Sequence, residues 1–396
     1  MAYYLLASMP AFVCGTLTMV LLFDLIQMPQ RSRCIMTIFM AVATLLYMGH
    51  FVYFTHETQL LPITDTIYCT CNPLVFPLYY VYIKSLTERH LRRWHVALLV
   101  LPAIICGILV GIAYWQTPDE AINSFINQYL FHSSMTNDYN TGTTALVVSH
   151  NISKIVFCLE IIPILVLGIR RINRYDKMLE QYYSSPEQKQ LKWVKMMLIL
   201  FVITSIISLV SFAIGRHYFI DRITKLAIPS TLYSLLLFTI GYIGTKQQGI
   251  EEWNEDEEED EMEEQPSLSM NNHLSERIEK LMTEEQLYLN PQLKLKDLVS
   301  QLNSNRNYVY HAINVEMGIS FAEYVNRMRI AHAEKLMKEN ANMPLSEVAS
   351  LSGFASSTSF YRNFRKLRGC SPTTLKASPR PSPKERENFN VRDLPN

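Results

Sequence analysis

Basic side chains gather in a short stretch near the C-terminal end of this 396-residue chain, at Arg362, Arg365, Lys366 and Arg368. Guanidinium and ammonium groups bind phosphate oxygens, and a guanidinium can also donate two parallel hydrogen bonds to guanine. The chemistry on offer is therefore recognition by charge and hydrogen bonding. The sequence shows no carboxylate pair, metal motif or nucleophile motif, so it predicts no enzyme, no metal ion and no cofactor.

A second set of ionisable side chains lies inside the long apolar stretch of residues 144–169. His150 and Lys154 are four residues apart and would share one face of a helix. Ionisable groups in an apolar segment usually face a polar interior or a cavity. Lys154 could bind an anionic ligand and His150 could tune it, so both are candidates for signal sensing. A structural hydrogen-bond network is the alternative.

Cys69 and Cys71 are the only close pair among seven scattered cysteines. A single C-x-C without a second cluster is weak support for a metal site or a disulfide bond. The sequence therefore favours ordinary apolar packing for these two side chains.

The basic stretch belongs to the second of two similar helical patterns. In the first, residues 295–302 carry apolar side chains on one helix face, Asn303 stands where a tight turn is needed, and a second helix is expected from 305 to 317. In the second, residues 345–351 are followed by a turn at Gly353 and a helix over 357–368. A long helix over 321–338 joins the two patterns, with Tyr324, Val325, Met328 and Ala331 expected on its buried side. The spacing predicts two helix-turn-helix units in tandem.

This arrangement resembles the AraC-type DNA-binding domain over about 84 residues. The resemblance rests on four stretches: Gly353-Phe354-Ala355-Ser356-Ser357, Phe360-Tyr361-Arg362-Asn363-Phe364-Arg365-Lys366, Gly369-Cys370-Ser371-Pro372 and Tyr324-Val325-Asn326-Arg327-Met328-Arg329. It implies two recognition helices, braced by one linking helix, that enter successive major grooves of DNA.

The resemblance also implies roles for single residues. The candidates for reading bases are Asn307, Tyr310 and His311 in the first recognition helix and Ser357, Thr358, Ser359 and Arg362 in the second. Arg306, Arg365 and Lys366 are expected to contact phosphate, which positions the protein without specifying sequence. The chain departs from the family at His311, where Arg is usual, and at Asn314 and Val315, where basic residues often follow. The second unit is therefore expected to contribute more to affinity.

The N-terminal part of the chain is apolar. Seven segments approach the roughly 20 residues needed to cross a bilayer, namely 2–27, 35–54, 66–86, 96–115, 144–169, 196–214 and 227–244. Pro73 and Pro77 are expected to interrupt the third. The stretch Phe76-Pro77-Leu78-Tyr79-Tyr80-Val81-Tyr82 resembles, less specifically, the sensor half of Bacteroidetes-type membrane-bound AraC regulators. The expected fold is all-α, with a seven-helix transmembrane bundle followed by a soluble tandem helix-turn-helix domain.

The distribution of Lys and Arg predicts the orientation of these spans. Loops after spans one, three and five, counted together with Lys84 at the end of the third span, carry thirteen of these residues, whereas loops after spans two, four and six carry three. Because Lys and Arg resist translocation, the N-terminus is expected outside and the C-terminal domain in the cytoplasm. The predicted location is the inner membrane of a bacterium.

The outer loop 116–142 is the longest and contains no Lys or Arg. Thr117 and Glu120 have capping-box spacing, with Pro118 between them, and apolar side chains follow at helical spacing. The loop is predicted to form a short amphipathic helix that serves as a lid or ligand-binding element, or that simply packs its apolar face.

An acidic run separates the two halves, with eleven Asp or Glu among residues 251–264. Such a run stays extended and solvated. It is either a spacer or a competitor that holds the basic reading surface away from DNA. The predicted domains are therefore a membrane sensor (1–250), an acidic linker (251–273), an AraC-type DNA-binding domain (274–376) and a disordered tail (377–396).

Together these features predict a membrane-embedded one-component transcription regulator that is controlled by a signal sensed in its membrane domain. The expected partners are double-stranded DNA, the lipid bilayer, RNA polymerase, a small-molecule or envelope signal and a second copy of the chain, since the basic surplus of residues 274–376 is only four. The alternative is a membrane transporter or receptor with a regulatory DNA-binding appendage.

Overall fold

The computed structural model describes residues 1–88, 91–131, 142–188, 223–246 and 268–377, together with scattered positions between 191 and 218. The predicted acidic linker at 251–264, the tail after residue 377 and most of the predicted sixth span lie outside the described residues. All regular elements in the described ranges are helices, as the sequence predicts.

The chain divides into two compact units. Unit 1 comprises residues 1–173 and 191–253, and unit 2 comprises residues 174–190 and 254–396. The short stretch 174–190 is thus grouped with the C-terminal part of the chain, while the predicted domain boundaries remain a prediction.

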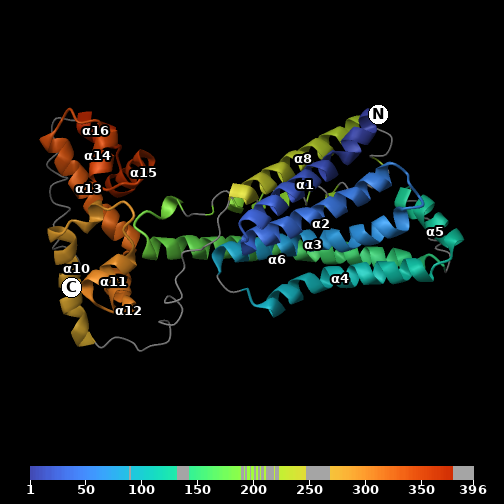
Figure 1. The fold of residues 1–396 in the computed structure, drawn as a ribbon, viewed down its shortest axis with the longest axis horizontal. Coiled ribbons are helices and arrows are strands. Elements are labelled where there is room, and N and C mark those ends of the chain that lie inside the picture. The colour runs from blue at the N-terminus through green and yellow to red at the C-terminus, as the bar shows by residue number, and fades with distance from the viewer. Residues whose placement is uncertain are drawn as a thin grey trace. The chain divides into compact units, whose positions relative to one another are not determined.

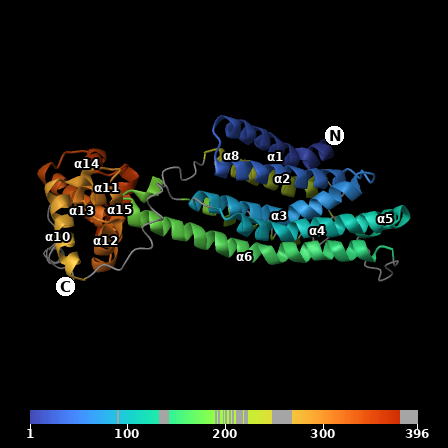
Figure 2. The ribbon, with the colours of Figure 1, turned by 60° about the horizontal axis from the view of Figure 1, so that its bottom comes forward.

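Unit 1 is a bundle of long helices (Figure 1). These are α1 (Ala2–Gln27), α2 (Arg31–Phe54), α3 (Leu61–Thr87), α4 (Arg93–Gln116), α6 (Thr144–Tyr182, as far as residue 173) and α8 (Ile223–Lys246). Helix α1 packs between α2 and α8, while α3 packs between α2 and α4. Figure 2 shows α6 running beside α3 and α4.

Five of these helices, α1, α2, α4, α6 and α8, are long and apolar enough to cross a membrane. Helix α3 has 27 residues, which is long enough, but it is less apolar than these five and is not a candidate span by composition. Seven spans are thus not confirmed. Pro73 and Pro77 lie inside α3 without ending it, so the expected interruption is wrong. Proline removes one donor and strains one turn, and packed neighbours on both sides of a helix can compensate for that.

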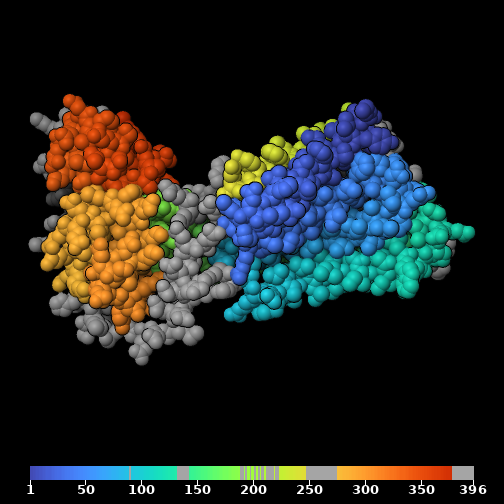
Figure 3. Space-filling model, in the orientation of Figure 1, coloured from blue at the N-terminus to red at the C-terminus, as the bar shows by residue number. Residues whose placement is uncertain are grey.

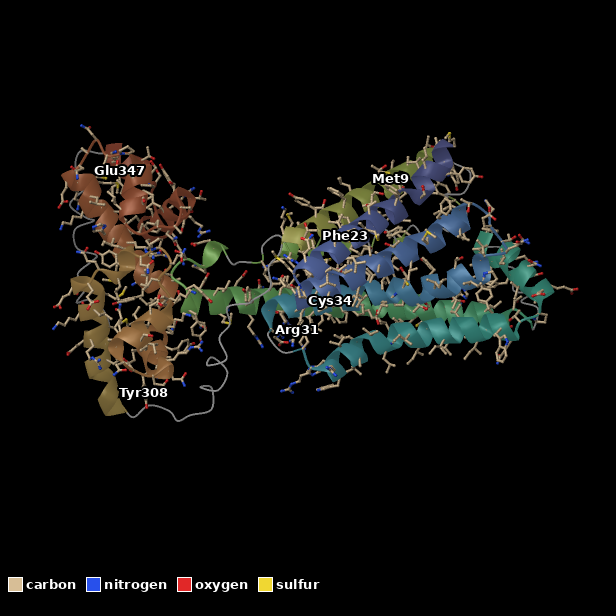
Figure 4. The ribbon with its side chains drawn as sticks, in the orientation of Figure 1. Met9, Phe23, Arg31, Cys34, Tyr308 and Glu347 are labelled. Carbon is tan, nitrogen blue, oxygen red and sulfur yellow. The ribbon has the colours of Figure 1, made fainter. Side chains whose placement is uncertain are left out.

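Large apolar side chains cover the outside of unit 1. Phe12 is 73% exposed, Leu159 68% and Ile228 75%. Met9 and Phe23 of α1 are further examples (Figure 4). Helices α1, α2 and α4 contribute much of the face seen in Figure 3. A surface this apolar is unusual for a protein that faces water on all sides.

The predicted amphipathic helix between α4 and α6 is present. It consists of α5 (Asp119–Phe125) and a π-helical turn η1 (Ile126–Phe131). Phe125, Ile126 and Leu130 pack with side chains of α2, α3, α4 and α6, and the Tyr53 hydroxyl donates a 2.6 Å hydrogen bond to the Leu130 carbonyl. The expected capping box is wrong, because the Thr117 hydroxyl donates back to the Ala113 carbonyl at 2.7 Å. We call residues 119–131 the lid.

Unit 2 holds two small cores joined by one helix. Its elements are α10 (Leu268–Glu284), η5 (Leu287–Leu289), α11 (Leu295–Leu302), α12 (Arg306–Tyr310), η6 (His311–Glu316), α13 (Phe321–Glu339), α14 (Leu345–Leu351), α15 (Ser357–Arg368) and α16 (Pro372–Ala377). Phe321 and Val325 of α13 belong to the first core, whereas Ile330 and Ala333 belong to the second. Helix α13 therefore braces both helix-turn-helix units.

The turns that the sequence predicts are present. Asn303 has φ 47° and Gly353 has φ 81°, so each provides the left-handed residue that ends the first helix of its unit. The buried face of α13 differs from the expectation, since Ala331 is exposed and Arg329 is buried. The helix is enclosed from two sides, which moves its buried face toward Val325, Arg329 and Ala333.

Candidate nucleic-acid interface

The second recognition helix, α15, is defined by a cap at each end. The Ser356 hydroxyl accepts a 3.2 Å hydrogen bond from the Ser359 amide, and Gly369 ends the helix at φ 73°. Phe360 and Phe364 are fully buried on one face. The opposite face is exposed, and it carries the predicted reading and phosphate residues Ser357, Thr358, Arg362, Arg365 and Lys366.

Two basic residues of α15 have partners on α13. Arg368 donates two hydrogen bonds to the Glu334 carboxylate at 2.6 and 3.0 Å, which ties α15 to the linking helix. Lys366 lies 3.9 Å from a Glu323 oxygen, but two thirds of its side chain stays exposed. Arg368 is thus a structural residue, whereas Lys366 keeps the access that a phosphate contact needs.

The first recognition helix begins at Asn305, whose side chain accepts a 2.8 Å hydrogen bond from the Asn307 amide. Val309 and Ile313 are its buried anchors, and Asn307, Tyr310 and His311 are half-buried on the other faces. The helix widens to a π-helix from His311, and His311 Nδ1 lies 3.4 Å from Glu316 Oε1. The two residues are five positions apart, which is one turn of a π-helix. His311, a predicted base reader, therefore has the Glu316 carboxylate as a neighbour.

A short segment outside the helix-turn-helix units lies against both recognition helices. We call residues 182–187 the strap. It begins at the last residue of α6 and enters the 3₁₀ turn η2 (Pro186–Gln188). Against the first helix, the Tyr182 and Tyr310 rings are stacked with centroids 6.0 Å apart, and the Arg306 guanidinium lies 4.3 Å from the Tyr182 ring centroid. The strap thus contacts one predicted base reader and one predicted phosphate residue there.

Against the second helix, the strap presents Glu187. Its carboxylate accepts hydrogen bonds from Arg362, from the Ser359 hydroxyl at 3.3 Å and from the Asn363 amide at 3.4 Å, and it forms an ion pair with Arg362. Ser359 is only 5% exposed. Two predicted base readers therefore hold a carboxylate in this structure.

Arg329 of α13 anchors the middle of the strap. Its guanidinium donates to the Tyr288 and Asn290 carbonyls, both at 2.7 Å, and to the Ser184 and Ser185 hydroxyls at 3.0 and 3.2 Å. Burial lowers its pKa to about 10, while the Glu187 carboxylate acts in the opposite direction. Arg329 stays protonated at neutral pH, and each of its three nitrogens donates to at least one acceptor. The Ser184 amide also donates to the Leu293 carbonyl at 3.1 Å.

In unit 1, the predicted sensing residues lie under the lid. His150 Nε2 is 2.5 Å from Asp65 Oδ2, and its Nδ1 is 2.7 Å from the Leu146 carbonyl oxygen. The Tyr114 hydroxyl donates to the same Asp65 oxygen at 2.9 Å. Lys154 donates a 2.7 Å hydrogen bond to the Tyr129 hydroxyl of the lid. The Tyr129 ring also lies 6.4 Å from the His150 ring, centroid to centroid, so Tyr129 contacts both predicted sensing residues.

Asp65, Cys69 and His150 are the group in the described residues whose ligand atoms could hold a metal ion. All three are buried, and these atoms lie within 4.8 Å of one another. Sequence reasoning missed this group. Asp65 and Cys69 are four residues apart on α3, which was a usable signal, but His150 is 85 positions from Asp65 and no spacing rule joins them.

Comparisons with known proteins agree with the C-terminal geometry. Residues 298–378 match the family described as a helix-turn-helix domain. The probable transcriptional regulator LumQ of Photobacterium leiognathi is 39% identical over 90 residues, which cover 22% of this chain and 36% of that protein. The Msm operon regulatory protein of Streptococcus mutans is 27% identical over 84 residues, or 21% of this chain and 30% of that protein.

The melibiose operon regulatory protein of Escherichia coli is 31% identical over 80 residues, which are 20% of this chain and 26% of that protein. The chain thus spans about a third or less of the length of these curated relatives. No solved structure matches it. Residues 298–378 thus match a helix-turn-helix domain and are similar to parts of known transcriptional regulators.

Proposed function

We propose that this protein is a one-component transcription regulator of the bacterial inner membrane, which reads DNA with α12 and α15 and is controlled by its membrane domain. The observation that carries the proposal is the capped helix α15, with an exposed face of Ser357, Thr358, Arg362 and Arg365, inside a domain similar to those of transcriptional regulators. Two such helices on one brace suit successive major grooves.

Membrane insertion is supported by the five apolar helices and by the exposed apolar side chains of unit 1. Lipid tails satisfy such a surface, while the helical backbone satisfies its own hydrogen bonds. The N-terminus is proposed to face outward and unit 2 to face the cytoplasm, as the Lys and Arg distribution predicts. RNA polymerase and a second copy of the chain are proposed partners on the cytoplasmic side.

The path of control is proposed to run through α6. This helix has 39 residues; it starts in unit 1 beside the lid and its last nine residues belong to unit 2, where the strap follows. The role of the acidic linker, as a spacer or as a competitor for the reading surface, remains a prediction, because residues 247–267 lie outside the described ranges.

The proposed function is tested by crosslinking DNA to the intact protein in its host cell and sequencing the recovered fragments. The double variant Arg362→Ala/Arg365→Ala should lose the discrete sites that the wild-type protein occupies. Lys280→Ala/Lys335→Ala is the matched control, since both lysines are exposed on other helices and the charge change is the same. Equal occupancy by the two double variants would contradict the proposed reading surface.

A transporter or receptor with a regulatory appendage is the alternative. It is favoured only by the ionisable groups of unit 1, chiefly Asp65, His150 and Lys154. Absence of DNA enrichment for the wild-type protein would make transport the function to measure next.

A further inference from the structure

The polar cluster under the lid has the composition of a metal site. Asp65, Cys69 and His150 each offer a donor that divalent zinc prefers: a carboxylate oxygen, a sulfur and an imidazole nitrogen. Each of the three residues is 4% exposed. Such a set is unusual in an apolar bundle, because buried polar side chains are costly there and usually serve function.

The surrounding contacts orient these donors. His150 Nδ1 lies 2.7 Å from the Leu146 carbonyl oxygen, which leaves Nε2 to face Asp65 and Cys69. An imidazole held through its other nitrogen by a carbonyl is the usual arrangement of a metal-binding histidine. Tyr114 holds the Asp65 carboxylate in the same way, at 2.9 Å.

The rearrangement that an ion would require is small. Donor atoms around a tetrahedral zinc ion lie roughly 3.3–3.6 Å apart. The Asp65 and His150 atoms, now 2.5 Å apart, would separate by about 1 Å, and Cys69, within 4.8 Å, would approach by a similar amount. The fourth position around the ion would remain open for the Tyr114 hydroxyl or for a water molecule.

We propose that Asp65, Cys69 and His150 bind one divalent cation of the zinc type beneath the lid. The Phe125 ring of the lid lies 5.0 Å from the His150 ring, centroid to centroid. A shift of the His150 side chain on ion binding would therefore displace the lid. The binding site stands on its own; its role as the controlling signal rests on the proposed function. Because His150 is on α6, the ion would contact the helix that leads to the strap.

Cobalt(II) tests the site in the full-length protein held in lipid nanodiscs, since it occupies zinc sites and reports a bound thiolate by an intense charge-transfer absorption. The wild-type protein should bind one cobalt ion per chain with this absorption, and zinc should displace it. Cys69→Ser should lose the absorption. Cys71→Ser is the matched control, a buried cysteine two positions away outside the cluster, and should keep it.

Absence of the thiolate absorption from the wild-type protein, or its persistence in Cys69→Ser, overturns the proposal. His150→Gln supplies a second check, because it should weaken cobalt binding at least tenfold and leave the sulfur in place. None of these measurements depends on DNA binding. The metal site is therefore tested independently of the proposed function.

A different observation carries a second inference, which concerns the strap. Tyr182 and Glu187, at its two ends, contact predicted DNA-reading or phosphate residues on both recognition helices: Arg306 and Tyr310 on the first, Ser359 and Arg362 on the second. A carboxylate against Arg362 takes the place that a guanine edge or a phosphate would take, and it would repel phosphate.

We infer that the strap is an intramolecular inhibitor. It blocks access of DNA to the predicted reading residues until the strap moves away. The hydrogen bonds from Arg329 to Ser184 and Ser185 fix its position, and Glu187 supplies the competing charge. This inference rests on the proposed function, since it requires that α15 read DNA.

Its test is the affinity of full-length protein in nanodiscs for a random-sequence duplex library, measured by fluorescence anisotropy. Glu187→Gln should bind DNA about fivefold more tightly than the wild-type protein, the effect of losing one partly exposed charge contact. Glu180→Gln is the matched control, because it removes the same charge from an exposed position near the end of α6, just before the strap. It should leave the affinity near the wild-type value.

The outcomes separate the two proposals. If all three proteins bind DNA equally, the strap is not an inhibitor but the DNA-binding function stands. If Glu180→Gln and Glu187→Gln tighten binding alike, the effect is one of net charge, and the specific contact is refuted. If no protein binds the library, both the strap inference and the proposed function fail.

Discussion

Arg329 Nη2 donates a 3.0 Å hydrogen bond to the hydroxyl oxygen of Ser184, although 145 positions of sequence separate the two residues. The same guanidinium donates to the Tyr288 and Asn290 carbonyls of the loop that precedes α11. One fully buried charge thus joins the linking helix, the first helix-turn-helix unit and the strap. A charge can occupy this position because neutral acceptors surround it, and each of its bonds is charge-assisted.

Replacing Arg329 should therefore destabilise unit 2. Arg329→Met keeps the apolar stem but leaves the Tyr288 and Asn290 carbonyls without their donor, at a cost of about 2–4 kcal/mol in the free energy of unfolding. Pulse proteolysis of the full-length protein in urea measures this. Arg327→Met is the control, since Arg327 is part-exposed and pairs with Glu323 at 2.7 Å; it should cost no more than about 1 kcal/mol. Equal losses would contradict the anchoring role of Arg329.

Gly353 is expected to be the least replaceable glycine of unit 2. Its φ is 81°, and a Cβ there would lie 2.6 Å from the Tyr288 carbonyl oxygen and 2.7 Å from the Leu289 Cα. Gly353→Ala combines a strained backbone with a clash against main chain, so its cost should exceed about 2 kcal/mol.

Gly318→Ala is the comparison for that prediction. Gly318 has φ 64° but nothing within 4 Å of an added Cβ, so only the backbone cost of about 1 kcal/mol applies. Both variants can be compared by urea unfolding of the full-length chain. A smaller loss for Gly353→Ala than for Gly318→Ala would show that the Tyr288 loop moves aside easily.

Acidification should weaken unit 2 through His332. Burial lowers the pKa of His332 below the ordinary value of 6.5, with the Lys335 charge acting in the same direction and Glu339 against it. The unfolded chain then binds this proton more readily than the folded chain, so stability falls as the pH drops below about 6.5 toward the folded pKa.

The comparison is urea unfolding at pH 7.5 and at pH 5, an interval that brackets the histidine range. His332→Gln should lose less stability over this interval than the wild-type protein does. An equal loss in both proteins would assign the acid sensitivity to other groups.

Arg362 and Arg365 should differ in the kind of defect that their loss produces. Arg362→Ala should relax the sequence preference of the enriched DNA sites at a cost of about 1–3 kcal/mol, because it removes the proposed base contact. Arg365→Ala should weaken binding of all sequences alike and lower the salt slope by about one. In vitro selection at several salt concentrations separates the two. A uniform loss from both variants would make Arg362 a phosphate contact.

The sequence by itself determined the tandem helix-turn-helix units of this protein. Asn303, Gly353 and the apolar spacing of 295–302 and 357–368 are local signals, and each acts within a few residues of the turn or helix that it specifies. The apolar helices of unit 1 and the amphipathic lid follow from composition and periodicity in the same way, as does the exposed basic face of α15.

Only the tertiary structure decided which distant residues meet. His150 pairs with Asp65 across 85 positions of sequence, and Arg362 contacts Glu187 across 175. Arg329 is a charge that a local pattern places at the surface, but the fold buries it. Periodicity gives the face of a helix but not the element that covers it. Whether a polar side chain ends in water, against a partner or inside a core depends on that covering element, which packing alone selects.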